Sequence, residues 1–216
     1  MNFEFFDPAM DLRITAGKLP HWYQPDVTYF VTYRTDDSLP VAVAELWHRR
    51  RDDWLRRHGI DPKATRWRAR LRDLPDARQR EYHNTFSREF LEHLDCGHGD
   101  CVLKRPDLAA IVADNLRHFD GQRYVLADFA VMPNHVHVLA CLLGSTDIVD
   151  QCGSWKKYTA TRINEALARR GRVWHEESFD CLVRAAEQFE HLRRYIADNP
   201  KKAGLREHEY VHWSRE

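Results

Sequence analysis

Two histidines separated by a single residue, His135 and His137, have the types and spacing best suited to chemistry in this sequence. They lie in a strongly apolar stretch that reads as a β-strand, where residues i and i+2 point to the same face. Their Cα atoms would be roughly 6 to 7 Å apart, so both imidazoles could reach one divalent cation. A lone H-x-H is more often a pair of hydrogen-bonded or exposed histidines. Here the apolar strand makes unpartnered rings costly, which favours a metal site.

A second group of metal-binding residue types is Cys96, His98 and Cys101 in the segment DCGHGDC. A structural zinc site needs four ligands in paired spacing, and the second pair is missing. We therefore favour a glycine-rich loop here and give zinc odds of roughly one in ten.

Helices and strands that could position these residues follow from hydrophobic periodicity and turn residues. Residues 29–33 read as a strand, and residues 41–94 read as helical, with one apolar stripe on Leu46, Trp47, Trp54 and Leu55. A second helix would carry Tyr82, Phe86, Phe90 and Leu94. Further elements are expected as a helix at 107–119, strands at 123–132 and 135–143, and helices at 148–168 and 186–197.

The two strands at 123–132 and 135–143 are joined by the short turn Pro133-Asn134, so they must be antiparallel. The second strand is apolar on both faces apart from its histidines and should lie centrally in the sheet. The expected fold is α+β: an antiparallel sheet with helices packed against it and a helical insertion after the first strand.

Length and composition suit one globular domain in the cytoplasm. The chain has 216 residues, of which 43% are hydrophobic and 31% charged, and its five cysteines have no framework spacing. No apolar stretch approaches the roughly 18 residues of a membrane span. The N-terminus lacks the pattern of a signal peptide.

The formal net charge is zero, so a nucleic-acid binder of this composition must concentrate its basic residues locally. Residues 46–72 contain ten Lys or Arg against three Asp, and residues 154–175 contain six against one Glu. Either run alone is about as well explained by a solvated helix face.

Several motifs together resemble the single-tyrosine HUH transposases, in particular the REP-associated tyrosine transposase branch of the IS200-like group. The motifs are MPNHVHVL, SWKKYTATRIN, GRVWHEESFD and YIADNPKKAGL, with HWYQPDVTYFVTYRTDDSLP upstream. The resemblance covers nearly the whole chain, from about residue 21 to residue 210. It implies a ferredoxin-like antiparallel sheet with helices on one face, and Mg²⁺ or Mn²⁺ bound by the H-x-H pair. It also implies cleavage of single-stranded DNA near imperfect palindromes by a tyrosine on a helix.

Matched to that pattern, His135 and His137 are the metal-binding pair and Tyr158 is the nucleophile. A phenol can attack phosphorus and keep the energy of the broken bond in a 5′-phosphotyrosine. Tyr158 falls at the edge of the apolar stripe of its helix, where it could face a cleft. For the third ligand, Glu165 and Asn164 remain open, because Arg162 stands one turn after the tyrosine and cannot bind a cation.

Basic residues around this helix are expected to contact DNA. They are Lys156, Lys157, Arg162, Arg169, Arg172 and Arg184. In the C-terminal part, Trp174, Phe179, Tyr195 and Leu205 are expected in the core, and Asn199-Pro200 is expected to stop a helix.

The resulting hypothesis is one HUH transposase-like domain over residues 1–216, with a helical insertion at about 41–105 and a helical tail at about 175–216. It would bind single-stranded DNA hairpins as a monomer or homodimer, away from membranes. One alternative is a catalytically inactive, domesticated protein that binds hairpins without cutting them. Another is a hydrolase that uses a histidine-bound metal and water, with Tyr158 structural.

Overall fold

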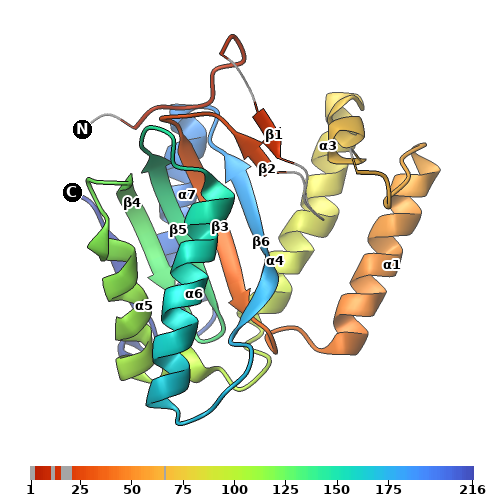
Figure 1. Cartoon of the computed structure of the whole chain (residues 1–216). Helices are drawn as coiled ribbons and strands as arrows, with labels where there is room; N and C mark the ends of the chain where they lie inside the picture. Colours follow the sequence, from red (N-terminus) through yellow and green to blue (C-terminus); the bar gives the residue numbers. More distant parts are fainter. Residues whose placement is uncertain (1–2, 11–12, 16–20, 66) are drawn as a thin grey trace.

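A five-stranded antiparallel sheet forms the centre of the computed structural model, which describes residues 3–10, 13–15, 21–65 and 67–216 (Figure 1). The strand order is β6-β3-β5-β4-β7. The strands are β3 (Thr28–Thr35), β4 (Tyr124–Val131), β5 (His135–Leu142), β6 (Trp174–Leu182) and β7 (Val211–Ser214). A short hairpin, β1 (Arg13–Thr15) with β2 (His21–Tyr23), precedes β3.

The order of elements along the chain is that of a ferredoxin-like fold. Helices connect β3 to β4 and β5 to β6, while β4 and β5 form a hairpin, which gives the βαββαβ pattern. β5 is the central strand, as its apolar sequence predicted, because it pairs with β3 on one side and β4 on the other. The predicted α+β class with an antiparallel sheet is therefore confirmed.

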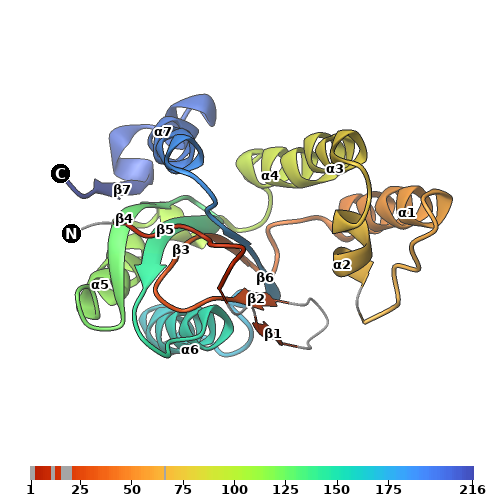
Figure 2. The same ribbon diagram turned by 90° about the horizontal axis from the view of Figure 1, so that it is seen from above.

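Both faces of the sheet are covered (Figure 2). Helices α5 (Pro106–His118) and α6 (Ile148–Ala166) pack on one face, where Val136 and Val138 of β5 join their core. Helix α7 (Ala186–Lys202) packs on the other face, against a smaller core that includes Leu139 of β5. Since α7 lies opposite α5 and α6, the helices are not confined to one face.

The helical segment after β3 has a core of its own beside the sheet. Its helices are α1 (Val41–Arg57), α2 (Trp67–Arg72), α3 (Asp76–Tyr82) and α4 (Arg88–Asp95), with a π-helical turn between α3 and α4. Trp54, Leu55 and Phe86 are among the buried residues. Leu46, expected in the same stripe, is 52% exposed.

The C-terminal part departs from the expected helical tail, because it contains the two edge strands β6 and β7. Helix α7 also continues through Asn199 and Pro200 to Lys202 instead of ending before them. Proline removes one backbone donor, but both residues are buried, and packing of this last turn holds the helix together. None of the described helices has an apolar stretch long enough to cross a membrane.

Candidate metal and nucleophile site

His135 and His137 lie side by side on the face of β5 that α7 covers. Both are buried, with exposed fractions of 1% and 0%, and their Nε2 atoms are 3.0 Å apart. They share this face because they alternate with Val136 and Val138, which enter the core on the other side.

The partners of the Nδ1 atoms decide which nitrogen of His135 carries the proton. Asn134 Nδ2 donates to the carbonyl oxygen of His98 at 3.0 Å, which leaves Asn134 Oδ1 to face His135 Nδ1 at 2.8 Å. Because that oxygen can only accept, His135 Nδ1 must be the donor. The lone pair of His135 is therefore on Nε2, directed at His137.

His137 also has a polar partner at each ring nitrogen. Its Nδ1 lies 2.8 Å from Thr32 Oγ1, and its Nε2 lies 2.9 Å from Asn199 Nδ2. Thr32 is the residue of β3 directly opposite His137 in the sheet. The two Nε2 atoms converge at 3.0 Å, and the lone pair of His135 is directed at His137. Rings held through their outer nitrogens with their inner nitrogens close together are typical of metal-binding histidines.

Burial keeps both imidazoles neutral, which is the form that binds metal. Desolvation lowers the pKa of His135 to about 3. It also lowers the pKa of His137 well below its usual value, and the neighbouring His135 adds to this shift.

A carboxylate completes a group of three candidate ligands. Asp95, the last residue of α4, places its Oδ1 3.5 Å from His135 Nε2. Ligand atoms of Asp95, His135 and His137 all lie within 4.8 Å of one another. Asp95 Oδ1 is buried without a hydrogen-bond partner. Burial raises the pKa of Asp95 to about 6, although the charge of Lys202 and a hydrogen bond from Asn199 oppose the shift.

Two polar side chains of α7 close the site from the opposite side. Tyr195 and Asn199 are four residues apart, so they lie on one face of the helix. The Tyr195 ring meets the His137 ring edge-on, with 5.3 Å between centroids, and Phe30 of β3 stacks on His137 at 5.6 Å. The Tyr195 hydroxyl and Asn199 Oδ1 are both buried without a hydrogen-bond partner. Burial raises the pKa of Tyr195, and the nearby Asp95 raises it further.

Tyr158, the nucleophile expected from the sequence, lies on the other side of the sheet. It is 53% exposed on α6, whose buried side packs through Trp155, Thr159 and Ile163. Trp155 donates to the hydroxyl of Tyr124, and Thr159 accepts from Trp174, so the rotation of α6 is fixed. Within this chain, the sheet separates the Tyr158 phenol from both imidazoles.

The two residues expected as third ligand, Glu165 and Asn164, also lie across the sheet from the histidines, because both belong to α6. Glu165 pairs with Arg162 at 2.8 Å, and Asn164 donates to the carbonyl oxygen of Gly171. The carboxylate beside the histidines is instead Asp95, and the amide beside them is Asn199.

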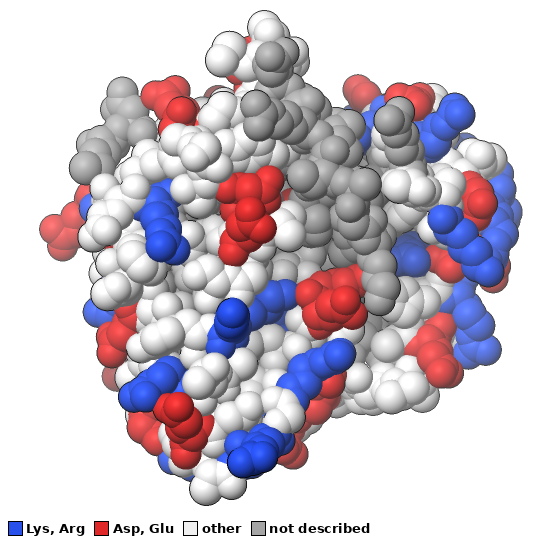
Figure 3. Space-filling view, viewed as in Figure 1, with Lys and Arg blue, Asp and Glu red and all other residues white. Residues whose placement is uncertain are grey.

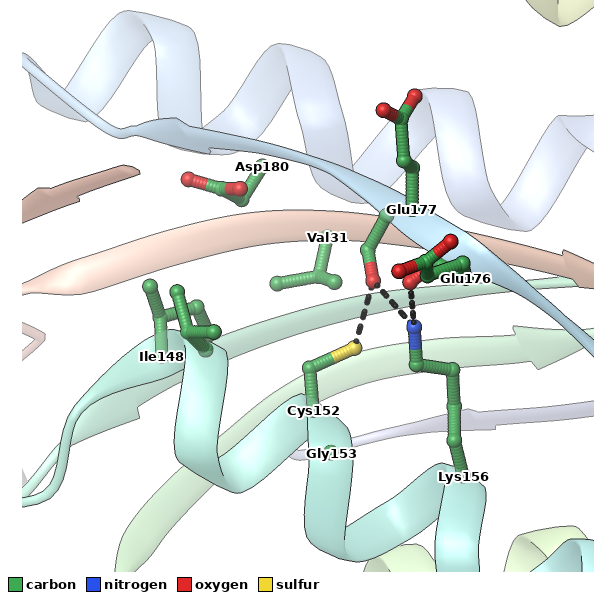
Figure 4. Close-up of a pocket in the computed structure, with 10 residues that line it drawn as sticks. Val31, Ile148, Cys152, Gly153, Lys156, Glu176, Glu177 and Asp180 are labelled. Atoms are coloured by element: carbon green, nitrogen blue, oxygen red, sulfur yellow. Dashed lines mark hydrogen bonds between the residues drawn. The ribbon is translucent and has the colours of Figure 1, made fainter. Parts of the chain in front are cut away.

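Lys156, expected at the DNA, makes hydrogen bonds within the chain instead. Its ammonium donates to the backbone oxygens of His175 and Glu176 and to Ser178 Oγ, in a pocket of about 330 Å³ between α6 and β6 (Figure 4). Asp180 and Cys152 also line this pocket, and the Cys152 thiol lies 3.1 Å from Ser178 Oγ.

Three of the other basic residues expected at the DNA have contacts within the chain. Arg169 is 3.8 Å from Asp100, and Arg172 is 3.5 Å from Asp36. Arg184 lies over the ring of Phe6, and Lys157 belongs to α6. On the face formed by α5 and α6, the coloured basic and acidic side chains are interspersed (Figure 3). The DNA contacts expected from the sequence stay a prediction.

Sequence reasoning missed Asp95, Tyr195 and Asn199. The tyrosine and asparagine carried a usable signal, since a spacing of four puts them on one side of a helix. The proline after Asn199 favours a helix stop, and the apolar ring of Tyr195 favours a core position, so the sequence alone did not point to this pair. Asp95 carried no local signal, because its neighbours at the site are 40 or more residues away in the chain.

Comparison with known proteins identifies the part of the chain that contains this site. Residues 106–199 match the family described as "Transposase IS200 like". No curated protein matches the chain.

Two solved structures match the chain at low similarity. One is a REP-associated tyrosine transposase bound to a REP hairpin, with 13% identity, a TM-score of 0.43 and coverage of 86% of this chain and 73% of that one. The other is a proposed transposase from Deinococcus radiodurans, with 14% identity, a TM-score of 0.29 and coverage of 82% and 93%. At these scores neither carries an argument about function. The family match covers β4, β5, α6 and most of α7, and this segment, which holds both histidines, Tyr195 and Asn199, is similar to the IS200-like transposase family.

Proposed function

We propose that this chain is a metal-dependent endonuclease and strand-transfer enzyme that acts on single-stranded DNA near REP-like hairpins, with Tyr195 as its nucleophile. One observation carries the proposal: Tyr195 and the two histidines lie on the same face of the sheet, with ring contact between Tyr195 and His137. The hairpin substrate follows from the sequence resemblance to the REP-associated branch. The cytoplasmic location expected from the sequence stays part of the proposal.

The side chains present fit a divalent metal. Two imidazole nitrogens face each other, and a carboxylate oxygen and an amide oxygen beside them have no hydrogen-bond partner. Nitrogen and oxygen donors in this mixture suit Mn²⁺ or Mg²⁺ better than the soft metals that prefer thiolates. His135 and His137 would hold the ion, with Asn199 Oδ1 as a further donor. When bound, the ion would supply Lewis-acid polarisation of a phosphate oxygen.

Tyr195 would perform the covalent step. Its phenol oxygen forms a bond to phosphorus and loses its proton, while the bond from phosphorus to the 3′ oxygen breaks and that oxygen takes up a proton from water. The products are a 5′-phosphotyrosine and a free 3′-hydroxyl. Since burial and Asp95 both raise the pKa of Tyr195, the free enzyme holds the phenol protonated until a positive charge arrives.

All the side chains in this arrangement come from one chain, so the proposed site would be complete in a monomer. Tyr158 then has no part in cleavage. Its exposed ring on α6 makes it a suitable matched control for Tyr195, because both are helix-borne tyrosines of the same protein.

The test uses a single-stranded REP-like hairpin labelled at its 3′ end, incubated with the protein and Mn²⁺ and separated under denaturing conditions. We expect the wild type and Tyr158→Phe to form a covalent adduct, and Tyr195→Phe and His137→Ala to form none. Adduct lost in Tyr158→Phe but kept in Tyr195→Phe would overturn the assignment. Hairpin binding without adduct or cleavage would identify an inactive binder, and cleavage that persists in Tyr195→Phe would identify a metal-dependent hydrolase.

A further inference from the structure

The helical insertion ends inside the candidate site. Asp95 is the last residue of α4, and α4 belongs to the helices that leave the sheet after β3. From Asp95 the chain turns through the glycine-rich loop 96–101 and reaches the short 3₁₀ helix Val102–Lys104 before α5. Figure 2 shows α4 and α7 on the same side of the sheet. Asp95 therefore approaches the histidines from one side, and Asn199 of α7 approaches from the other.

Loop 96–101 is held at one end by the segment that follows β3. Gly99 has a φ of +86°, and a Cβ there would lie 2.7 Å from the backbone oxygen of Asp37. Asp100 N–H donates to Asp37 Oδ2 at 2.7 Å. Only glycine fits so close to the neighbouring backbone with a left-handed φ. The loop cannot move away from Asp37 without losing these contacts.

At its other side the same loop holds the turn that carries His135. The carbonyl oxygen of His98 accepts from Asn134 Nδ2, and Leu103 N–H donates to the carbonyl oxygen of Pro133. Through Asn134 this contact decides which nitrogen of His135 carries the proton. The position of loop 96–101 and the orientation of the His135 imidazole are therefore linked.

Asp95 faces the lone pair of His135. Its Oδ1 is 3.5 Å from His135 Nε2, and that nitrogen has no proton to donate because Nδ1 carries it. Two electron-rich atoms buried at this distance repel each other unless a positive charge lies between them. Asp95 Oδ1 is also buried without a hydrogen-bond partner. The carboxylate thus lacks full compensation within the chain.

We propose that Asp95 is an anionic third metal ligand, and that the exit of the helical insertion is a wall of the active site. The proposal rests on the metal-binding part of the proposed function. With two neutral imidazoles and one carboxylate, a divalent ion would keep a net charge of +1 for a phosphate. Because ligand binding stabilises the conformation that binds, the ion would also fix the end of α4 and loop 96–101.

The first test measures Mn²⁺ binding to the purified full-length protein by calorimetry, without DNA. We expect Asp95→Asn to weaken Mn²⁺ binding by at least about tenfold, because it keeps the shape and removes the charge. The matched control is Glu92→Gln, which removes the same charge one turn earlier on α4, where Glu92 pairs with Arg88 at the surface. Equal affinity of wild type and Asp95→Asn, or an equal loss in both variants, would overturn the proposal.

A second measurement separates a ligand role from a merely structural one. In the metal-free state we expect Asp95→Asn to melt at the same temperature as the wild type or higher, because an uncompensated buried charge is removed. Hydrogen exchange should show that Mn²⁺ protects residues 94–101 in the wild type and not in Asp95→Asn. Protection that is equal in both proteins would contradict coupling between the insertion and the metal.

These results can be told apart from failure of the proposed function. Tight Mn²⁺ binding that depends on Asp95, with no DNA adduct at Tyr195, would support the ligand and reject the nucleophile. An adduct at Tyr195 with Mn²⁺ affinity independent of Asp95 would support the nucleophile and reject Asp95 as a ligand. A wild type that binds no Mn²⁺ would reject Asp95 as a ligand.

Discussion

Two imidazole Nε2 atoms lie 3.0 Å apart in the protein interior, and each ring has a polar partner at its Nδ1. Rings held through their outer nitrogens with their inner nitrogens close together are the residue-scale signature of a metal-binding pair. Both histidines are also kept neutral by burial, which has a consequence for stability at low pH.

We expect the metal-free protein to lose stability as the pH falls from about 6.5 towards about 3, the usual and the folded-state pKa of His135. The folded pKa is depressed, so the unfolded chain takes up protons first and acid favours unfolding. Urea unfolding monitored by tryptophan fluorescence at several pH values measures this loss. His135→Gln should flatten the curve in this range, and an unchanged curve would contradict the burial of a neutral ring.

The sequence predicted the histidine pair because alternation along a strand is a local rule, and residues i and i+2 share a face whatever the rest of the fold does. The tyrosine beside the histidines could not be obtained in this way. Tyr158 and Tyr195 both lie on helices at plausible spacings, and only the side of the sheet on which each helix packs distinguishes them. That side depends on contacts such as Trp155 with Tyr124, which join distant parts of the chain.

At the scale of elements, the rotation of α6 and the side occupied by α7 decide which phenol lies beside the histidines. Most helices and strands followed from periodicity: α5, α6, β4 and β5 lie within about two residues of their expected bounds. The edge strand β6 was missed, because its sequence WHEESFDCL is polar and lacks clear alternation. The end of α7 was missed because tertiary packing overrides the tendency of proline to stop a helix.

A pair of substitutions on α6 tests its rotation. Trp155→Ala should lower the free energy of unfolding by about 3 to 5 kcal/mol, because the indole is fully buried and donates to Tyr124. Tyr158→Ala should change it by less than about 0.5 kcal/mol, because its ring is largely in solvent. Chemical denaturation gives both values. Similar losses in the two variants would mean that α6 presents a different side to the sheet.

At the scale of the whole molecule, three separate parts of one chain meet at the site: the central strand, helix α7 and the exit of the insertion. The insertion has its own hydrophobic core, yet its last residue is next to His135. The division of the chain into one domain with an insertion at about 41–105 stays a prediction.

If the proposed site is assembled from one chain, it should not need residues from a second copy. Mixing two inactive variants tests that claim. We expect a mixture of His137→Ala and Tyr195→Phe to form no DNA adduct, because neither chain contains a complete site and each site needs its own α7. The readout is the yield of covalent adduct against the wild type diluted with the same excess of inactive protein. Recovery of adduct in the mixture would show that a tyrosine from one chain serves the histidines of another.

The central claim is that the phenol beside the histidines, not the exposed one on α6, becomes joined to DNA. Mass spectrometry of the trapped adduct after digestion with trypsin and nuclease tests this claim most directly. The two candidates fall in different tryptic peptides, YIADNPK for Tyr195 and YTATR for Tyr158. We expect the residual nucleotide on YIADNPK, and its presence on YTATR would contradict the account.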